Sequence, residues 1–585
     1  MTDATPLPSV RRMVDAVASR IPDAVAVECG DERLTFAELY KASQVVADRV
    51  RHTPGFRSGG LVATLFERGV GSVVGQLGVW RAGGAYLPLD PSLPKRRIRT
   101  ILDDAKPQAL MTSQEVGDLW PAELTIVGPP LTPFTPAAQA PDRVEDGPVA
   151  YVVYTSGSTG TPKGVEVGQH SLAGLTEWHR RAYGTGPGVR VCALAGPGFD
   201  ASVWEIWSAL ANGATLVLPN GVDTADAHVI GEFLERAAID ECFLSTPLAE
   251  QLFALAEPPA SLKLLTTGGD RLRVYPPSDF PAAVHNHYGP TEATVVTTAS
   301  TDLRKAPQDG LPVIGEPITG ADVRVVRSDG VVTTVPGEEG ELLIGGSVLA
   351  LRYRHDDRLT QERFSVDPDG LRWYRSGDIC RWNDQGALEF VGRRDRQVNL
   401  RGHRIELAEV EHAVLRLPGV DQVAATVVPD EDGGRLVVFF CGATEVEETM
   451  REALAGVLPR YMLPSAVHRI EEMLLNANGK IDRAALREPG PEKTQEPSVT
   501  QEPSVTQESS STLRTLSGIW TAHLGRTPGP QDDFFALGGH SITAARVTGQ
   551  VRKSFGVTVA LSALFDRPVL ADYVELLDTL LHGDG

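Results

Sequence analysis

The chain has 585 residues, of which 42% are hydrophobic and 22% charged, and its formal net charge is −21. This length exceeds what one hydrophobic core fills, so we expect two to four domains. Nucleic acid is not an expected partner, because so acidic a chain would be repelled by its phosphates.

The sequence favours a cytoplasmic protein with no membrane contact. It holds no apolar run long enough to cross a bilayer, and its polar start, MTDATPLPSVRR, lacks the layout of a signal peptide. The cysteines lie far apart with no Cys-x-x-Cys pair, which favours buried thiols over a disulfide framework or a zinc site. These cysteines are Cys29, Cys192, Cys242, Cys380 and Cys441.

The N-terminal two thirds of the chain show the rhythm of α/β layers. Short apolar runs, such as VAYVVYT (149–155) and ATLVLP (214–219), alternate with helical patterns such as IGEFLERAA (230–238). After about residue 395 the pattern changes to a smaller set of helices and strands. We therefore expect a large domain at 1–394 and a small one at 395–487.

A biased segment follows these two domains. Residues 488–512 contain two copies of TQEPSV and a decayed third, with little that could be buried. Such composition predicts a disordered or extended linker.

Residues 513–585 then predict a small helical bundle. LRTLSGIWTAHLG and ADYVELLDTLLHG both carry apolar residues at helical spacing. Between them, Ala544, Val547, Val551 and Phe555 mark a third helix that ends at Gly556.

The stretch YTSGSTGTPKGV, residues 154–165, is the first candidate site. It is not a P-loop, because Lys163 follows a proline and precedes a glycine. It follows an apolar strand, however, so backbone N–H groups at its glycines and its hydroxyls can converge on an anion. On these features alone a surface linker stays open. The residues concerned are Thr155, Ser156, Gly157, Ser158, Thr159, Gly160 and Gly164.

The full string resembles the phosphate-binding loop of the adenylate-forming superfamily, specifically the adenylation domains of nonribosomal peptide synthetases. Further motifs of that family occur in its order, the first upstream of the loop and the others downstream, and the resemblance covers roughly residues 10–487. They are RAGGAYLPLDPSLPKRRI, FDASVWE, NHYGPTE, GELLIGG, YRSGD, GRRDRQVNLRGHRIEL and NANGKIDR.

The resemblance implies an α/β fold with a large N-terminal and a small C-terminal subdomain, and an enzyme that needs ATP and Mg²⁺. A substrate carboxylate would attack the α-phosphorus of ATP and pyrophosphate would leave. Positioning and charge stabilisation would carry the catalysis, since no enzyme nucleophile is needed.

The resemblance also implies roles for single residues. Lys480 would be the catalytic cation that reaches the α-phosphate and the substrate carboxylate, and Glu292 would be the magnesium ligand. Tyr288 would stack on adenine, Asn286 would bond its edge, and Asp378 would accept the ribose hydroxyls. The nucleotide-binding set is Thr155, Ser156, Gly157, Ser158, Thr159, Gly160, Lys163, Gly268, Asn286, Tyr288, Gly289, Thr291, Asp378, Phe390 and Arg393.

In this family the small subdomain rotates between the two half-reactions. Asp395 stands at the position of the hinge and Gly402 at that of the tunnel for the incoming thiol. The chain departs from the family pattern at Ser376, which replaces a threonine, and at Asn399, which replaces a lysine, and LALRYR lacks the usual glycine. The change at Asn399 puts one contact of the second conformation in doubt.

The string DDFFALGGHSI resembles the signature of peptidyl carrier domains, which are four-helix bundles. It implies that Ser541 carries a covalent 4′-phosphopantetheine. Without the resemblance, Ser541 is a helix N-cap, and GHSIT lacks the second glycine of a hydrolase elbow. The linker would hold this carrier near the adenylation site at high effective concentration.

The family's pocket positions predict the class of substrate. Asp200 would pair with the α-amino group of an amino acid, because a buried carboxylate needs such a partner. The other positions form a narrow apolar cup that favours leucine or another branched aliphatic residue. Thr266 and His287 leave open tyrosine or a hydroxylated side chain, unless His287 only bonds a backbone carbonyl. The pocket comprises Asp200, Ala201, Trp204, Phe243, Thr266, Gly268, His287, Val295 and Val296.

The sequence thus predicts an adenylation–carrier pair for nonribosomal peptide, antibiotic or related secondary metabolism. Its expected partners are an amino acid, a phosphopantetheinyl transferase, and a downstream synthetase or tailoring enzyme, and an MbtH-like helper stays open. Two alternatives remain, an acyl- or aryl-CoA ligase and a catalytically silent carrier scaffold.

Overall fold

The computed structural model describes most of the chain in two compact units. The described residues are 7–113, 125–127, 145–157, 161–308, 310–400, 402–429, 434–474, 481, 483, 486–488, 510–535, 537, 539, 541–557, 559, 563–564 and 567–582. The first unit comprises Met1–Val222 and Ala227–Glu409, and the second comprises Asp223–Asp226 and Val410–Gly585. The first unit therefore extends beyond Asp395, where the sequence places the start of the small domain.

A nine-stranded sheet forms one layer of the first unit. Its strands, in spatial order, are β15 (Glu316–Pro317), β14 (Thr298–Ala299), β13 (Ala283–Tyr288), β12 (Leu264–Gly268), β11 (Glu241–Ser245), β9 (Arg190–Cys192), β10 (Thr215–Leu218), β1 (Val25–Cys29) and β2 (Glu32–Thr35). The strands from β13 to β1 run parallel. Parallel strands bring their carboxyl ends to one edge, where ligands of α/β proteins bind.

A seven-stranded sheet forms another layer. Its order is β19 (Arg352–Tyr353), β8 (Lys163–Gly168), β7 (Val149–Thr155), β4 (Ala85–Leu89), β3 (Leu61–Leu65), β5 (Ala109–Thr112) and β6 (Thr125–Val127). Strand β7 is the apolar run VAYVVYT, and its centre is buried as the sequence predicts. The loop of the first candidate site joins β7 to β8, which pair antiparallel.

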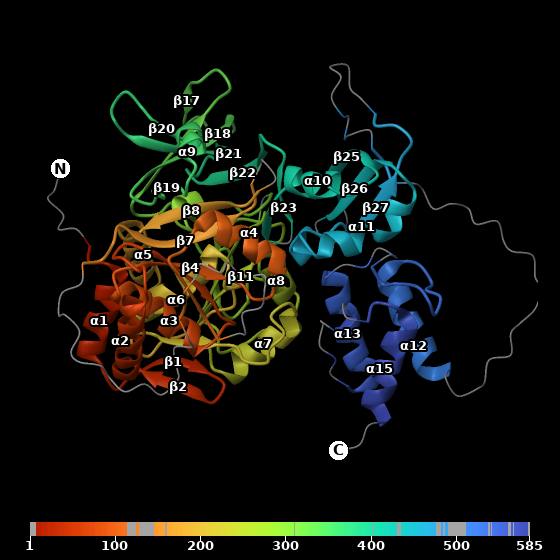
Figure 1. Ribbon diagram of the computed structural model, residues 1–585, viewed down its shortest axis with the longest axis horizontal. Helices are drawn as coiled ribbons and strands as arrows, with labels where there is room; N and C mark the ends of the chain where they lie inside the picture. The colour runs from red at the N-terminus through yellow and green to blue at the C-terminus, as the bar shows by residue number, and fades with distance from the viewer. Residues whose placement is uncertain are drawn as a thin grey trace, which may run out of the picture. The chain divides into compact units, whose positions relative to one another are not determined.

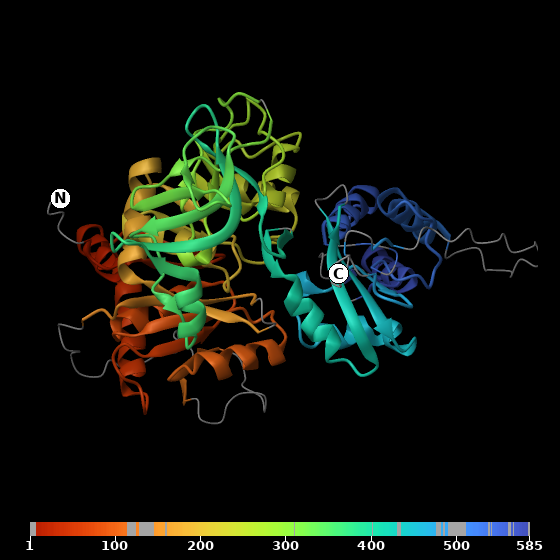
Figure 2. The same cartoon turned by 90° about the horizontal axis from the view of Figure 1, so that it is seen from above.

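A third sheet, green in Figure 1 and Figure 2, lies at the top of the view in Figure 1. Its strands are β17 (Val332–Thr333), β16 (Ala321–Val326), β18 (Glu339–Gly346), β21 (Arg372–Trp382) and β20 (Phe364–Val366), and β22 (Leu388–Arg393) pairs with β21. The hairpin of β23 (Gln397–Leu400) and β24 (His403–Glu406) completes the first unit.

Helices pack on these sheets around one extensive core that includes the buried Trp80, Trp207 and Tyr151. The alternation of strands and helices confirms the α/β class. The helices up to the end of the first unit are α1 (Val10–Arg20), α2 (Phe36–His52), α3 (Val70–Arg81), α4 (Lys95–Ala105), α5 (Gln169–Tyr183), α6 (Asp200–Asn212), α7 (Ala227–Arg236), α8 (Thr246–Phe253), α9 (Asp357–Arg363) and α10 (Leu407–Leu415), with the short 3₁₀ helix η1 (Thr291–Ala293).

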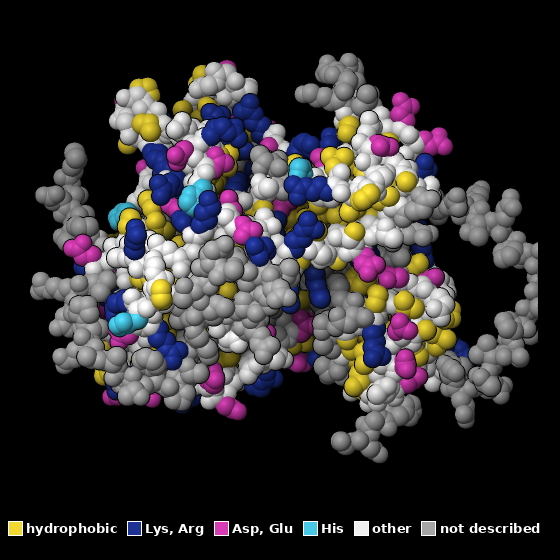
Figure 3. Space-filling model, viewed as in Figure 1, with side chains coloured by type: hydrophobic (Ala, Val, Ile, Leu, Met, Phe, Trp, Pro, Cys, Tyr) yellow, Lys and Arg dark blue, Asp and Glu magenta, His cyan; other side chains and the backbone are white. Residues whose placement is uncertain are grey.

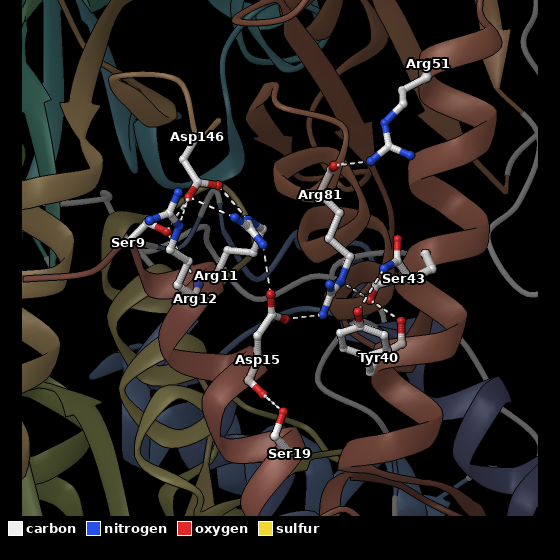
Figure 4. Close-up of polar contacts among 11 residues, drawn as sticks. Ser9, Arg11, Arg12, Asp15, Ser19, Tyr40, Ser43, Arg51, Arg81 and Asp146 are labelled. Atoms are coloured by element: carbon white, nitrogen blue, oxygen red, sulfur yellow. Dashed lines mark hydrogen bonds and ion pairs between the residues drawn. The ribbon is translucent and has the colours of Figure 1, made fainter. Parts of the chain in front are cut away.

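A buried arginine joins α1, α2 and α3 (Figure 4). The side chain of Arg81 is only 3% exposed, and it forms an ion pair with Asp15 on α1. Its Nε donates to the hydroxyl of Ser43 on α2 at 2.7 Å, and its guanidinium lies 4.0 Å from the centre of the Tyr40 ring. The network therefore fixes the three N-terminal helices to one another.

We expect Asp15→Ala to lower the free energy of unfolding by about 3 kcal/mol, because it leaves the buried guanidinium of Arg81 without its counter-ion. Urea denaturation followed by tryptophan fluorescence measures this change. The control is Asp103→Ala, which removes an exposed pair with Arg99 on α4 and should cost at most about 0.5 kcal/mol. Equal losses for the two variants would contradict a structural role for the Arg81 network.

The second unit contains a three-stranded sheet and a set of helices. The sheet has the order β25 (Val420–Val428), β26 (Arg435–Gly442) and β27 (Ala466–Arg469), with α11 (Glu445–Ala455) and the 3₁₀ helix η2 (Arg460–Met462) in the same region. The described helices of the C-terminal part are α12 (Ser510–Leu524), α13 (Ser541–Phe555) and α15 (Leu570–His582).

The helices α12, α13 and α15 pack around a core of their own that includes Trp520, Phe534 and Tyr573. Helix α13 is the third helix that the sequence predicts, and Gly556 follows it with φ 73° and a bond to the carbonyl of Arg552. Helix α12 begins a little before the predicted limit of the linker, at Ser510. Residues 489–509 of the predicted linker lie outside the described residues.

Several composition-based expectations can be compared with the structure. All five cysteines are buried and free, as predicted. Among the described helices, none has the length and apolarity that a membrane span requires. The face in Figure 3 carries both basic and acidic side chains, although the net charge of the chain is −21.

Candidate functional site

The glycine-rich loop begins where β7 ends. Thr155, the last residue of β7, pairs with Lys163, the first residue of β8. A Cβ at Gly157 would lie 1.9 Å from the carbonyl oxygen of Thr161, so the turn requires glycine there. The predicted loop residues Ser158, Thr159 and Gly160 lie outside the described residues.

Hydrogen-bond donors of this loop already meet oxygen atoms. The backbone N–H of Gly157 donates to a carboxylate oxygen of Glu409 at 3.3 Å, and the hydroxyl of Ser156 donates to the carbonyl of Arg404 at 2.8 Å. The hydroxyl of Thr155 is buried and has no partner among the described residues. A negatively charged oxygen therefore lies at the loop, and a further polar group is unpaired beside it.

Glu292, on η1, is the most completely enclosed carboxylate of the site, with an exposure of 0%. Its Oε1 accepts a hydrogen bond from the Tyr353 hydroxyl at 2.7 Å and lies 3.3 Å from Nζ of Lys163. Its Oε2 lies 3.2 Å from the guanidinium of Arg404. Burial by itself would raise the pKa of Glu292, but Arg404, Lys163 and Tyr353 hold that pKa below its ordinary value.

This arrangement keeps Glu292 ionised in a buried place, which suits a hard divalent cation. The three groups that now surround the carboxylate balance its charge. Among the described residues there is no group of three or more His, Cys, Asp and Glu that could hold a metal by protein ligands alone. One carboxylate together with the oxygens of a bound nucleotide is the usual way in which Mg²⁺ is held.

A second polar cluster lies between β13 and the sheet of β21 and β22. The hydroxyl of Tyr288 donates to Asp378 at 2.5 Å, and Arg393 forms an ion pair with the other oxygen of that carboxylate. Arg393 also reaches Asp395, with Nε donating at 2.8 Å. Burial raises the pKa of Asp378, while Arg393 and the hydrogen bond from Tyr288 oppose that rise.

The described side chains of this cluster fit a nucleoside. The amide Nδ2 of Asn286 donates to the carbonyl of Val313 at 2.9 Å, while its buried Oδ1 has no described partner. That oxygen can accept a hydrogen bond from the exocyclic amine of a purine. The ring centre of Tyr288 lies 6.5 Å from that of Phe390, and Ser376 donates its hydroxyl to the carbonyl of Leu342. The serine that replaces the family's threonine thus retains a hydroxyl that is used.

The predicted amino-acid pocket is assembled from α6, β11, β12, β13 and the turn after η1. Asp200 is the first residue of α6, where the helix dipole favours a negative charge. Burial raises the pKa of Asp200, against hydrogen bonds from Thr291 and the backbone of Ala201. A cation would stabilise the carboxylate of Asp200 in this buried position. The α-ammonium group that the sequence predicts would be such a cation.

The backbone of the pocket is constrained at two places. Gly268 pairs with His287 across β12 and β13, and a Cβ there would lie 2.5 Å from the carbonyl oxygen of His287. Val295 has φ 68°, a conformation that β-branched residues rarely adopt. Neighbouring Thr294 is held by a hydrogen bond from its hydroxyl to the carbonyl of Val348 at 2.6 Å. Such local strain is common at ligand sites.

Within the described part of the chain, His287 bonds no backbone carbonyl, which was the alternative for its role. Its Nε2 lies 2.6 Å from the hydroxyl of Tyr183, the last residue of α5. The side chains of Trp204 and Phe243 pack edge to face beside it, with ring centres 5.7 Å apart. The pocket therefore combines aromatic walls with a hydrogen-bonded histidine.

The hairpin after Asp395 packs against other parts of the first unit. Gly402 has φ 80°, and a Cβ there would lie 3.0 Å from the Cβ of Ser245. The backbone of Gly269 lies alongside Gly402 as well. The positive φ and this close approach both favour glycine at position 402.

Besides the loop residues Ser158, Thr159 and Gly160, two further predicted residues cannot be placed by their side chains. Lys480 lies outside the described residues. Ser541 is the first residue of α13, which is where the sequence expects it, but its side chain is not among those described.

Four residues at these sites were not predicted from the sequence. Arg404 and Tyr353 contact Glu292, Glu409 contacts the loop, and Tyr183 contacts His287. The signal for Arg404 was present, since it lies within GRRDRQVNLRGHRIEL. Tyr183 and Glu409 have no comparable signal, because only the fold brings them to the site.

Three family models match successive parts of the chain. The model of the AMP-binding enzyme matches residues 14–354, that of the AMP-binding enzyme C-terminal domain matches 409–480, and that of the phosphopantetheine attachment site matches 514–577. The chain belongs to the AMP-binding enzyme family.

Curated relatives of the chain include bacterial peptide synthetases. The chain is 37% identical over 590 residues to a linear gramicidin synthase polypeptide of Brevibacillus parabrevis, covering 97% of this chain and 11% of that protein. It is 36% identical over 601 residues to phosphinothricin tripeptide synthetase PhsB of Streptomyces viridochromogenes, covering 98% of this chain and 49% of that protein. The chain thus spans about a tenth to a half of the length of these relatives.

Solved structures show the same combination of domains. The structure of holo-PA1221, an NRPS protein containing adenylation and PCP domains, matches with a TM-score of 0.81 and 27% identity, over 98% of this chain and 97% of that one. The fused adenylation–PCP di-domain NpsA-ThdA from Klebsiella oxytoca has a TM-score of 0.72 at 24% identity, over 80% of this chain and 94% of that one. ATP, Mg²⁺ and a covalent phosphopantetheine arm are the cofactors of this class of enzyme.

Proposed function

We propose that the chain activates an α-amino acid with ATP and transfers it to its own carrier domain. The observation that carries the proposal is the contact of Lys163, from the glycine-rich loop, with the buried carboxylate of Glu292. It brings a phosphate-binding loop and a candidate magnesium ligand into one site. The match to adenylation domains supports the same reaction.

The reaction balances without an enzyme nucleophile. A carboxylate oxygen of the amino acid attacks the α-phosphorus of ATP, and pyrophosphate leaves. Once Ser541 carries its phosphopantetheine arm, the arm would supply the thiol that accepts the aminoacyl group from the adenylate, and AMP would be released. In the first step Lys480 stabilises the charge that develops between the carboxylate and the α-phosphate.

The remaining residues bind and orient the two substrates. Tyr288, Asn286 and Asp378 receive the nucleoside, and Arg393 holds Asp378 in place. Glu292 supplies the protein ligand for Mg²⁺, which neutralises charge on the phosphates when bound. The proposal extends to every residue of the nucleotide-binding set that the family resemblance implies.

Asp200 receives the ammonium group of the amino acid. The aromatic and apolar walls of Trp204, Phe243, Val295 and Val296 suit a side chain of the size of leucine. Hydroxylated and aromatic amino acids are the alternative that Thr266 and His287 support. The shape of the pocket thus defines size more firmly than polarity.

In the second half-reaction the carrier must reach the adenylation site. We attribute this to the small subdomain from 395, the linker at 488–512 and the carrier from 513. Asp395 acts as the hinge, Gly402 lines the path of the thiol, and Ser541 carries the arm. A phosphopantetheinyl transferase must supply that arm, and the match to a phosphopantetheine attachment site supports this. A downstream module or tailoring enzyme then receives the loaded residue, and an MbtH-like helper remains open.

The proposal predicts ATP–pyrophosphate exchange that depends on an α-amino acid and not on the corresponding carboxylic acid without the amine. In Asp200→Asn, kcat/KM for the amino acid should fall about a hundredfold, because the ammonium group loses its charged partner. The KM for ATP should change little. Exchange that responds equally to the acid without the amine would favour the acyl- or aryl-CoA ligase class instead.

A further inference from the structure

Behind the pocket wall lies a buried group of polar side chains that the proposed reaction does not use. His287 is 4% exposed, and only one of its ring nitrogens has a partner, the hydroxyl of Tyr183 at 2.6 Å. Its Nδ1 is buried and has no partner among the described residues. One hydrogen-bonding atom of the pocket is therefore left unpaired beside the aromatic walls.

A small cavity continues from this wall. It has a volume of about 20 Å³, and Trp204, Phe243 and Thr266 of the predicted pocket form part of its lining. His179, Ser208 and Glu241 line its other side. The space admits roughly one water molecule. Val191, Cys242 and Leu264 line the cavity as well, so the pocket is backed by both apolar and polar groups.

Three atoms of this cavity lining are buried without described partners. They are Nε1 of Trp204, Oγ of Ser208 and Nδ1 of His179. The carboxylate of Glu241 is occupied, because the hydroxyl of Thr185 donates to it at 2.7 Å and Nε2 of His179 lies 3.5 Å away. Including His287, four polar atoms without described partners thus gather around one end of the pocket.

Several buried polar atoms without described partners carry a free-energy cost. A buried polar atom without a hydrogen bond costs about 1–3 kcal/mol, so a water or a ligand is expected to satisfy these atoms. The pKa of His287 is lowered by burial and by the neighbouring His285 and His179, so the ring is neutral. A neutral ring offers one hydrogen-bond donor or acceptor and provides no counter-ion for a carboxylate.

We infer that the pocket selects an amino acid of about leucine size whose side chain ends in an uncharged hydrogen-bonding group. Tyr183 is a positioning residue in this account, because its hydroxyl fixes the orientation of His287 and determines which nitrogen faces the substrate. The inference rests on the proposed function. The sequence favours a substrate with a plain aliphatic side chain, and the inference replaces it with a polar side chain of similar shape.

The test uses pairs of amino acids that have similar shape and differ in polarity. Pyrophosphate exchange is measured with leucine and asparagine, valine and threonine, and phenylalanine and tyrosine. A site built to hydrogen-bond its substrate rejects the apolar analogue strongly, whereas an apolar site only weakly rejects an added hydroxyl. Within the pair whose size suits the pocket best, we expect the polar amino acid to have a kcat/KM at least about a hundredfold higher than that of the apolar one.

Two outcomes of this panel would overturn the inference. An apolar member that is the best substrate overall would overturn the polar pocket and leave the adenylation function intact. Silence with every amino acid, from a protein shown to be folded, would contradict the adenylation function and the inference together.

The variant Tyr183→Phe isolates the positioning role. Its KM for the preferred amino acid should rise about tenfold and its preference for the polar member should shrink, while its KM for ATP stays unchanged. Tyr40→Phe is the matched control, because Tyr40 lies on α2 and its hydroxyl contacts only Gln44 in the described structure. An unchanged preference in Tyr183→Phe would overturn the role of Tyr183.

A second variant keeps the test decisive if Tyr183→Phe does not fold. His287→Leu removes the polar end of the pocket and keeps a side chain of moderate size. It should shift the preference toward the apolar member of each pair. The same preference as in the unmodified protein would overturn the assignment of His287 as the group that reads the side chain.

Discussion

Replacing Lys480 with alanine is expected to lower amino-acid-dependent ATP–pyrophosphate exchange at least about a hundredfold, with the protein still folded. The reason is that the first half-reaction has no nucleophile on the enzyme and depends on stabilisation of charge at the reacting carboxylate and α-phosphate. Exchange at saturating ATP and amino acid measures the effect directly.

Lys263→Ala is the matched control for this variant. Lys263 is 77% exposed, and its ion pair with Asp240 lies on the surface of the first unit. It should exchange pyrophosphate at the rate of the unmodified protein. If Lys480→Ala also retained full exchange, Lys480 would not be the catalytic cation. If neither variant nor the unmodified protein exchanged pyrophosphate with any amino acid, the silent-scaffold alternative would be favoured.

Ser541→Ala is the second variant with a large expected effect. It should abolish covalent loading of the amino acid while leaving pyrophosphate exchange unchanged, because in the proposed function Ser541 carries the arm and takes no part in adenylation. Intact-protein mass spectrometry after treatment with a phosphopantetheinyl transferase, ATP and the amino acid measures the loading.

The control for the carrier variant lies on the same helix. Ser554→Ala changes an exposed residue near the end of α13 and should load as the unmodified protein does. A Ser541→Ala protein that still gained the mass of a tethered amino acid would contradict the assignment of the attachment site.

Local sequence patterns predicted the elements of the fold well. The apolar run at 149–155 became β7, the helical pattern at 230–238 lies largely within α7, and the third carrier helix ends before Gly556. These elements follow from periodicity and from glycine, which act over a few residues. The order of strands in the sheets is set by contacts between distant segments, and no short pattern in the sequence carried it.

The residues of the site likewise divide into those that local motifs identify and those that only distant contacts bring together. The motifs identified Glu292, Lys163 and Asp378, and the structure brings Glu292 and Lys163 within 3.3 Å. The partners of these residues were not predicted, because Tyr353 and Arg404 reach Glu292 from segments that are 61 and 112 residues away in the chain. The hairpin that carries Arg404 belongs to the first unit.

The polar end of the pocket is a further case. Thr266 and His287 could be identified by position, but the unpaired atoms of His179 and Ser208 are visible only in the folded chain. A set of pocket positions therefore describes the lining and omits the groups behind it. The proposed preference for a polar side chain depends on those groups.

One measurement tests the central claim most directly, which is that this chain adenylates an amino acid and loads it onto its own carrier. The phosphopantetheinylated protein is incubated with ATP, Mg²⁺ and a mixture of amino acids, and its intact mass is recorded with and without ATP. The account predicts an ATP-dependent gain of one aminoacyl group that a thioester-cleaving reagent removes. A protein that carries the arm and gains no aminoacyl group under these conditions would contradict it.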